Sequence, residues 1–321
     1  MSFKLVGIGE VLWDLLPAGP QLGGAPANFA YHAHALGATA SLVTRVGHDD
    51  LGNAIRERFA QIALVDATIQ VDDVAPTGTV TVALTDKGIP NYVIHENVAW
   101  DHLAVTTPGL NAVRGADAVC FGSLAQRGDI SRDSIQQLVA AAPPHALRVF
   151  DINLRQKFYS RDVIERSLRL SSVLKLNDDE LPILAQLFGL TGSTRHQMDT
   201  LAQTFDLRLV ALTRGPAGSL LFQAGEWSDC PSFPTIVVDT IGAGDAFTAA
   251  LVMGLLCRMP LHVINGLADE VARAVCSCAG ATPTLPEHLS DRYAAGYAAP
   301  GAAADSRVEP FRPQHHSTQE I

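Results

Sequence analysis

The sequence predicts an α/β fold, in which a mainly parallel sheet is covered by helices on both faces. The first observation behind this prediction is that strand-like apolar runs alternate with segments of helical length up to about residue 290. The second is composition, because 47% of the 321 residues are hydrophobic and can bury a sizeable core. This length suits one large domain with an insert, or two small domains.

The predicted elements follow one another in a βαβ rhythm. Lys4–Ile8 is the first strand, and 10–16 continues in extended form to a turn at 17–20. Further strands are expected at 40–46, 118–121, 148–152, 173–176, 209–212, 218–223 and 235–238. Helices are expected at 29–36, where Gly37 is the C-cap, and at 53–62, 133–141, 164–170, 184–188, 198–204 and 246–257. Ligands of such sheets bind at the carboxyl ends of the strands.

Two segments depart from this rhythm. Residues 79–84 are rich in β-branched side chains, 86–88 form a turn signal, and 91–95 read as a second strand. This hairpin interrupts the βαβ pattern and is predicted to be an inserted lid. Residues 293–321 are rich in Ala, Gly, Pro and His with little periodicity, and we expect a poorly ordered tail there.

Charge and cysteine usage narrow the class of protein. The formal net charge is −10 and no Lys/Arg-rich run occurs, which argues against nucleic-acid and anionic-membrane partners. The five cysteines form no CxxC pair, which favours a reducing compartment and gives no support for zinc. Glu10 and Asp14 interrupt the N-terminal apolar stretch, unlike in a signal peptide, and the run 246–257 is too short to span a bilayer. We therefore expect a cytoplasmic protein.

The stretch Asp239–Asp245, of sequence DTIGAGD, joins the run 235–238 to the apolar helix after it. Free N–H groups and the helix dipole at such a turn suit a phosphate, and Gly242 and Gly244 allow close approach. Asp245 is placed to accept a proton beside that anion, which is the minimum equipment for phosphoryl transfer to a hydroxyl. Taken alone, an ordinary helix entry explains the stretch equally well.

Asp14 and Asn28 bracket another Gly-rich turn, at 23–28. A carboxylate and an amide on rigid backbone supply the acceptors and donors that a polyhydroxylated ligand needs. The alternative is a turn with a helix-capping asparagine.

Asn177 and Glu180 end a predicted strand with the spacing of a capping box. In a capped helix Pro182 would be the fifth helical residue, where proline is costly. We therefore expect the helix to begin near Asp179 and to leave Asn177 and Glu180 free, and a carboxylate beside phosphates usually acts through Mg²⁺ and its waters.

Two further segments follow predicted strands. Arg155 is a candidate to steady the charge of a transferring phosphate, although a surface arginine is the commoner case. The glycines of 213–218 let a nucleotide lie against the backbone, or form a plain turn. The P-loop, the dinucleotide fingerprint and the protein-kinase signatures are absent, and no histidine is assigned to catalysis.

Taken together and in this order, the motifs resemble those of the ribokinase-like, PfkB-type carbohydrate kinases. Residues 239–245 match that family's C-terminal signature and 23–28 its N-terminal one, while 45–52, 177–180 and 213–218 fall where the family has counterparts. The resemblance covers roughly residues 4 to 290. The stretches 9–14, 76–79, 99–101 and 151–155 look like those of bacterial fructokinases. One departure, Ala268-Asp269 in place of a frequent Ala-Asn pair, concerns the adenine pocket.

The resemblance implies a ribokinase-like three-layer αβα core with a mainly parallel sheet and a small β lid. The core would comprise 1–12, 24–75 and 101–290, the lid 13–23 and 76–100, and a flexible tail 291–321. It also implies a homodimer formed through the lid, and a lid that excludes water from the reaction.

The resemblance also implies an ATP-dependent sugar kinase, most like a fructokinase, in which Asp245 takes the proton of a primary hydroxyl. The implied sugar ligands are Asp14, Gly24 and Asn28, together with Arg155 and Asp245. The developing charge would be held by Gly242, Ala243 and Gly244, helped by Arg155. Asn177 and Glu180 would face the phosphates, with Glu180 reaching Mg²⁺ through water, and Thr213, Gly215 and Gly218 would line the nucleotide beside Gly242 and Gly244. A monovalent cation such as K⁺ near Thr240 is used by some members.

Two rival functions remain open at this point. One is a kinase for ribose, a keto-deoxy sugar acid or a nucleoside. An acid substrate would favour basic residues in the lid, where only Lys87 is found, so a neutral sugar is preferred. The other is a sugar-binding protein without catalysis, against which the intact Asp245 and Arg155 argue.

Overall fold

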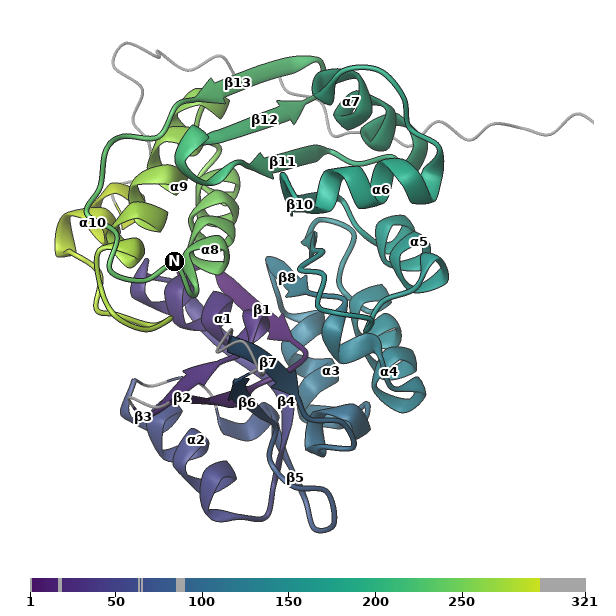
Figure 1. Cartoon of the computed structure of the whole chain (residues 1–321), viewed down its shortest axis with the longest axis vertical. Helices are drawn as coiled ribbons and strands as arrows, with labels where there is room; N and C mark the ends of the chain where they lie inside the picture. Colours follow the sequence, from purple (N-terminus) through teal and green to yellow (C-terminus); the bar gives the residue numbers. More distant parts are fainter. Residues whose placement is uncertain (1, 17–18, 63, 65, 85–89, 295–321) are drawn as a thin grey trace, which may run out of the picture.

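The computed structural model describes residues 2–16, 19–62, 64, 66–84 and 90–294, and its centre is a nine-stranded sheet (Figure 1). The strand order is β13-β12-β11-β10-β9-β8-β1-β4-β5, and all neighbours are parallel except the two pairs that involve β12. The strands are β1 (Lys4–Ile8), β4 (Thr39–Gly47), β5 (Ile69–Asp72), β8 (Ala118–Phe121), β9 (Leu147–Asp151), β10 (Val173–Asn177), β11 (Leu209–Thr213), β12 (Ser219–Gln223) and β13 (Glu226–Cys230). The predicted mainly parallel sheet is confirmed.

Helices cover both faces of this sheet. One core cluster joins it to α1 (Ala25–Ala35), α2 (Asp50–Gln61), α8 (Ala243–Leu256), α9 (Leu261–Cys276) and α10 (Glu287–Ala294). The other cluster joins it to α3 (Thr107–Arg114), α4 (Asp129–Ala140), α5 (Arg161–Leu170), α6 (Glu180–Phe188) and α7 (Thr194–Phe205). Short 3₁₀ turns are η1 (Asp66–Thr68), η2 (Ala99–His102), η3 (Leu124–Gln126) and η4 (Gly215–Ala217). The predicted three-layer αβα arrangement is therefore also confirmed.

The sequence of the strands and of α8 explains this layering. All four residues of β8 are buried, because a parallel strand between two helical layers has no solvent side. Helix α8 is buried from Ala246 to Leu255, since it packs on the sheet, on α1 and on α9. An apolar helix without a polar face fits only such a position. Within the described part of the chain, no helix is both long and apolar enough to cross a membrane.

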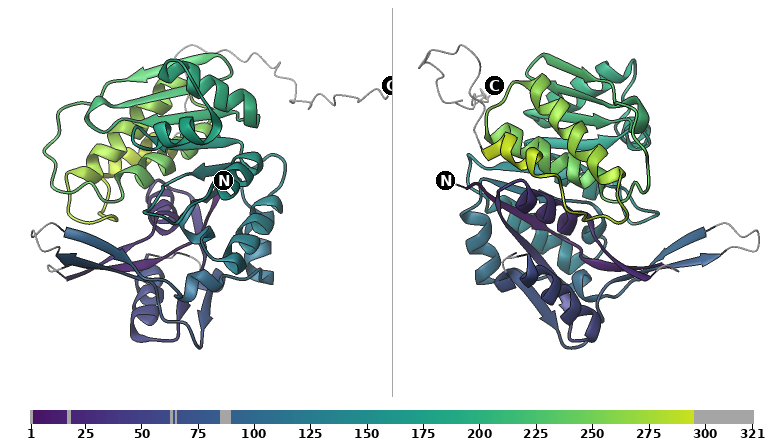
Figure 2. Two further views of the ribbon diagram at one scale, coloured as in Figure 1. Left: turned by 45° about the vertical axis from the view of Figure 1, so that its right-hand side comes forward. Right: turned by 90° about the vertical axis from the view of Figure 1, so that its left-hand side faces the viewer.

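A second, four-stranded sheet projects from the body (Figure 2). Its order is β3-β2-β6-β7, formed by β2 (Leu12–Leu16), β3 (Gly19–Gly23), β6 (Thr79–Leu84) and β7 (Pro90–Ile94). Strands β6 and β7 are the predicted hairpin, and β2 joins them in parallel through Trp13, Asp14 and Leu15. The expected small β lid is therefore present. Lys87 and the rest of the hairpin turn lie outside the described residues.

One predicted strand is absent. The run 235–238 lies in the irregular connection between β13 and α8, and its apolar side chains are exposed, Ile236 at 85%. Its β-branched composition favours a strand, but β13 already forms the edge of the sheet and 235–238 pairs with no strand. Strands β5 and β13, both at sheet edges, were not predicted, because 226–230 is largely polar and 69–72 is very short.

The predicted helices begin three or four residues earlier than expected, and α3, α9 and α10 were not predicted. Two boundaries bear on the predicted site and tail. Helix α1 begins at Ala25 rather than Phe29, with Gly24 as its N-cap and Pro26 in the first turn, where a proline needs no N–H partner. Asn28 is therefore a helical residue, and the alternative of a capping asparagine is excluded. Helix α10 continues to Ala294 and buries Tyr293, so the expected tail cannot begin at 291 or 293. Residues 295–321 lie outside the described part of the chain.

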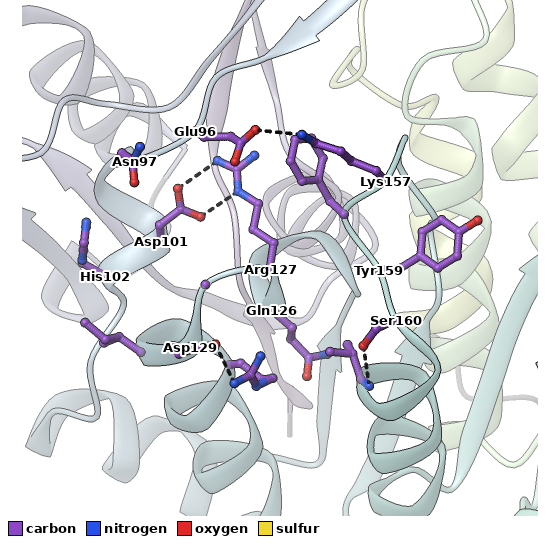
Figure 3. Close-up of a pocket in the computed structure, with 15 residues that line it drawn as sticks. Glu96, Asn97, Asp101, His102, Gln126, Arg127, Asp129, Lys157, Tyr159 and Ser160 are labelled. Atoms are coloured by element: carbon purple, nitrogen blue, oxygen red, sulfur yellow. Dashed lines mark hydrogen bonds and ion pairs between the residues drawn. The ribbon is translucent and has the colours of Figure 1, made fainter.

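An arginine clamp holds both ends of the lid hairpin on the core, beside a cavity of about 660 Å³ (Figure 3). The Arg127 guanidinium donates to both carboxylate oxygens of Asp101, at 2.8 and 2.9 Å, and to the carbonyl of His95, just after β7. The guanidinium also stacks 4.0 Å from the ring centre of Trp100. The Trp100 indole in turn packs on Gly78, just before β6, so closely that a Cβ on Gly78 would collide with it. The clamp therefore fixes where the lid enters and leaves the core.

We expect Arg127→Met to destabilise the protein by about 3–5 kcal/mol, because it leaves the Asp101 carboxylate buried without its partner. Arg127 and Asp101 side chains are only 7% and 10% exposed. The matched control is Arg132→Met, which breaks a pair with Asp129, 85% exposed, and should cost less than about 1 kcal/mol. Urea unfolding of both variants measures the difference, and equal losses would contradict a structural clamp.

Candidate active site

A cavity of about 1230 Å³ lies at the carboxyl ends of the parallel strands, beneath the lid. It is large enough for more than one small ligand. Of the residues singled out from the sequence, those that line it are Asp14, Gly24, Asn28, Arg155, Asn177, Thr213, Gly215, Gly218, Gly242, Ala243, Gly244 and Asp245. Glu180 does not line it. Motifs far apart in the sequence therefore meet in one place.

Asp245 is the partly buried carboxyl group in the first turn of α8. Its Oδ2 accepts a 2.8 Å hydrogen bond from Asn28 Nδ2 of α1. Burial, and then the nearby Asp151 carboxylate, raise the pKa of Asp245 from 3.8 to about 7, although Lys175, the Asn28 hydrogen bond and Arg155 lower it. A carboxyl group that titrates near neutral pH can take up and release a proton under ordinary conditions.

The glycine turn before α8 is fixed from behind. Gly242, the N-cap, has φ of 78°, a left-handed conformation that favours glycine, and a Cβ there would lie 2.5 Å from the Ala281 carbonyl oxygen. That carbonyl accepts a 2.9 Å hydrogen bond from Nε2 of buried His32. Burial lowers the pKa of His32 to about 4, so the ring is neutral and carries its proton on Nε2. The Ala243 N–H donates to Thr240 O at 3.3 Å, a long bond that an incoming anion would have to share.

The lid side of the cavity presents polar groups that lack partners within the described structure. Asn28 Oδ1 and Glu10 Oε2 are both buried without a hydrogen bond. Burial raises the pKa of Glu10, and also raises the pKa of Asp14, on lid strand β2, to about 6. Gly24 lets the backbone at the start of α1 pack directly on the backbone of Glu10, since a Cβ on Gly24 would lie 2.6 Å from Glu10 O. Hydroxyl groups of a ligand would satisfy these acceptors.

A buried lysine lies beneath the glycine turn. Lys175 Nζ is 3.1 Å from Asp151 Oδ1, and both side chains are almost inaccessible, 7% and 5% exposed. Thr248 of α8 donates to the other oxygen, Asp151 Oδ2, at 2.8 Å. Lys175 also lines the cavity. An ion pair thus connects the centre of the sheet to the helix that carries Asp245.

Asn177 and Glu180 are not free, contrary to the expectation from Pro182. Asn177 Oδ1 accepts the N–H groups of Asp179 and Glu180, and Glu180 Oε2 accepts that of Asn177, as in a capping box. The capping box and Pro182 are compatible because α6 starts only at Glu180. Pro182 then lies in the first turn of the helix, where its missing N–H costs nothing. Glu180 Oε1 accepts from Leu154 N at 2.8 Å. Each carboxylate oxygen of Glu180 therefore already has a partner.

The remaining predicted residues stand on loops after the strands. Asn177 and Thr213 end β10 and β11 and are paired in register. Arg155 is exposed and lies in a loop held by the left-handed residues Asn153 and Gln156, whose φ angles are 43° and 47°. Gln156 Nε2 donates to the carbonyl of Tyr92 in lid strand β7. Left-handed residues of this kind are common in ligand-binding loops. Here the loop that contains them is joined to the lid by the Gln156 hydrogen bond.

The chain matches the family model described as pfkB family carbohydrate kinase over residues 20–288. It belongs to that family. It is 30% identical over 306 residues to a fructokinase from Escherichia coli, covering 89% of this chain and 97% of that one. The structure of an uncharacterized sugar kinase from Pyrococcus horikoshii in complex with ATP is 28% identical, with a TM-score of 0.75 and 90% and 99% of the two chains covered. A fructokinase from Vibrio cholerae with fructose, ADP and calcium has a TM-score of 0.75 at 22% identity, which bears on the fold alone.

This family match confirms three inferences drawn from the motifs, namely the resemblance, the fold class and the enzyme class. Sequence reasoning missed three buried residues of the cavity region, namely Glu10, His32 and Lys175. For Lys175 a signal was present, because a lysine inside the apolar run Val173–Leu176 is unusual and almost never buried without a partner. Glu10 carries a similar signal, because it interrupts an apolar stretch. Nothing local marks His32, since its burial depends on segments distant in the sequence.

We expect Asp245→Asn to stabilise this kinase increasingly as the pH rises. The pKa of this carboxyl group is about 7 in the folded protein and 3.8 as its ordinary value. Between these values the folded state holds a proton that the unfolded chain has released, so the carboxyl's contribution to stability falls with rising pH. The asparagine should gain about 4 kcal/mol at pH 8 and less than half of that at pH 5.

Denaturant unfolding at the two pH values measures this gain. Asp162→Asn is the matched control, because Asp162 is 64% exposed in a surface pair with Arg166. A gain that is the same at both pH values would contradict a raised pKa at Asp245.

Proposed function

We propose that this carbohydrate kinase transfers the γ-phosphate of ATP to a primary hydroxyl of a sugar, and that the sugar is D-fructose, giving fructose 6-phosphate. The observation that carries the proposal is the placement of Asp245. Its carboxyl group is partly buried, has a pKa raised to about 7 and lies at the amino end of α8, in a cavity that also presents unpartnered carboxylate and amide oxygens able to accept from sugar hydroxyls. A base next to an anion-binding turn is what phosphoryl transfer to a hydroxyl requires.

In the proposed reaction the sugar oxygen attacks the γ-phosphorus while the bond from that phosphorus to the β–γ bridging oxygen breaks. The hydroxyl proton passes to the ionised Asp245, the phosphoryl group passes to the sugar, and ADP leaves. Gly242, Ala243 and Gly244 would hold the developing charge at the dipole of α8, and Arg155 would approach it from the lid side. Asn28 orients the base through its hydrogen bond to Oδ2.

The two ends of the cavity suit the two substrates. Asp14, Gly24 and Asn28 line the end next to the lid, where the buried acceptors suit sugar hydroxyls. Thr213, Gly215 and Gly218 line the other end, together with Asn177 and Ala272 from neighbouring elements. The backbone approach that glycines allow there suits the nucleotide. Lid contacts through Gln156 and Arg127 would keep water from the phosphate.

Mg²⁺ would enter with the nucleotide rather than occupy a site formed by the protein alone. No group of three or more His, Cys, Asp or Glu side chains that could hold a metal occurs among the described residues. Glu180 has amide donors on both oxygens, so it fits Mg²⁺ only through bound water, the arrangement expected for a cation that keeps its hydration shell. K⁺ near Thr240 and a homodimer through the lid stay predictions.

A neutral sugar is favoured over a sugar acid by the charges of the cavity. Its carboxylates, from Glu10, Asp14, Asp178, Asp179, Asp245 and Asp269, outnumber its cations, from Arg155, Lys175 and Arg273. A substrate carboxylate would meet net repulsion there. Fructose is chosen among neutral sugars because curated relatives such as the Escherichia coli protein are named fructokinase.

We expect ADP release with Mg-ATP and fructose, and little with ribose, a keto-deoxy sugar acid or nucleosides. Asp245→Asn should lower turnover by roughly 10²–10⁴-fold, because it removes the base, while fructose binding measured by calorimetry persists. Asp162→Asn should retain full activity. Turnover with a nucleoside but not fructose would refute the choice of sugar, and near-normal turnover of Asp245→Asn would refute the base.

A further inference from the structure

Lys175 occupies the space that a side chain at position 244 would need. Its Nζ lies 2.9 Å from where a Cβ on Gly244 would stand, directly under the first turn of α8. Asp151 holds the ammonium at 3.1 Å. The Thr248 hydroxyl, one turn after Gly244, lies 2.8 Å from Asp151 Oδ2 and 3.0 Å from Gly244 O, and its single proton can be given to either oxygen. The position of Lys175 is therefore coupled to the helix turn that carries Asp245.

The cost of burying charge makes this arrangement notable. A buried ion pair contributes little net stability compared with apolar residues of the same size, so stability alone does not explain it. Burial by itself would lower the pKa of Lys175, but Asp151, Glu180 and Asp245 outweigh burial and raise it. The ammonium thus stays charged although it is buried, because carboxylates surround it.

Several groups surround Asp245 and Lys175, and of these Asp151, Lys175, Asn28 and Arg155 shift the pKa of Asp245 directly. The surrounding groups are Asp151 at the end of β9, Arg155 in the loop after it, Cys120 on β8, Glu10 between β1 and β2, Glu180 on α6, and Asn28 on α1 as a neutral donor. Lys175 is the buried cation of this group, whereas Arg155 is exposed. Screening by water weakens the influence of an exposed charge far more than that of a buried one.

We propose that Lys175 is the positioning residue that keeps Asp245 ionised, its ammonium being fixed under the anion turn by Asp151. This rests on the proposed function, because it assigns the residue that makes the base of that reaction available at neutral pH. Asp151 acts in the opposite sense, since its own negative charge opposes ionisation of Asp245 while its hydrogen bond holds Lys175. The two residues together set the pH at which the kinase becomes active.

The test is a pair of variants with opposite expected effects on the pH profile of kcat. Lys175→Met keeps the side-chain length and removes the charge, so the acid limb should move up by roughly one to three pH units. Activity at pH 7 should then fall roughly five- to five-hundredfold and recover as the pH rises. Asp151→Asn should move the limb to lower pH, and the double variant should return it close to the wild-type position.

A second readout does not depend on turnover. The ¹³C NMR signal of the Asp245 carboxyl carbon, assigned by its loss in Asp245→Asn, should titrate with the same shifts in each variant. Circular dichroism and thermal unfolding identify a variant that fails to fold, and the double variant, which removes both partners of the Lys175–Asp151 ion pair, keeps the test possible in that case.

The outcomes separate this inference from the proposed function. An acid limb and a carboxyl titration that stay in place in Lys175→Met, with turnover lowered equally at every pH, would overturn the role of Lys175 and leave the kinase intact. Absence of turnover by the wild-type protein on all sugars would overturn the proposed function, whereas a shifted carboxyl titration in Lys175→Met would still support the electrostatic coupling.

Discussion

The proposed reaction depends on a carboxylate, Asp245, whose ionisation is opposed by burial. Asp245 lies where the sheet, α1 and α8 meet, and desolvation by these layers opposes its negative charge. The groups that offset this cost come from different elements, namely Asn28 from α1, Lys175 from β10 and Arg155 from the loop after β9. The fold matters for function because it brings these elements to one point, at the carboxyl edge of parallel strands.

The same packing that raises the pKa of Asp245 also fixes its geometry. Helix α1 contributes at two levels, with Asn28 on the carboxylate and His32, one turn later, on the Ala281 carbonyl that backs Gly242. A single helix therefore positions both the base and the turn next to it. The lid is fixed separately, by the Arg127 clamp at its two ends and by Gln156 on β7. Core and lid thus have independent supports, which would let the lid move without disturbing the base.

The sequence predicted what local patterns determine, and failed where distant contacts decide. The spacing of glycines in 239–245 and the strand–helix alternation predicted where the motifs meet, and every predicted site residue except Glu180 lines the cavity there, because backbone requirements of turns are local. The run 235–238 shows the limit, since β-branched residues form a strand only where a partner strand exists. Asn177 and Glu180 show another limit, because α6 starts at Glu180, two residues after the start of a helix capped by Asn177, so a capping box and Pro182 occur together. His32 becomes meaningful only through burial, which no local pattern states, whereas Glu10 and Lys175 each interrupt an apolar run.

Charge balance explains why so acidic a cavity could serve a reaction of phosphates. With Asp151, Asp245 and Glu180 near one another and Lys175 among them, the buried groups carry an excess of negative charge. A bare nucleoside triphosphate would be repelled, so in the proposed reaction the nucleotide has to arrive with its divalent cation. Backbone amides cap Glu180 and stabilise its carboxylate, so that Glu180 needs no ion pair with Lys175. Lys175 is paired with Asp151 instead. The capping box that sequence reasoning set aside as a rival to function is therefore compatible with it, because it holds a negative charge in place beside the phosphate end of the cavity.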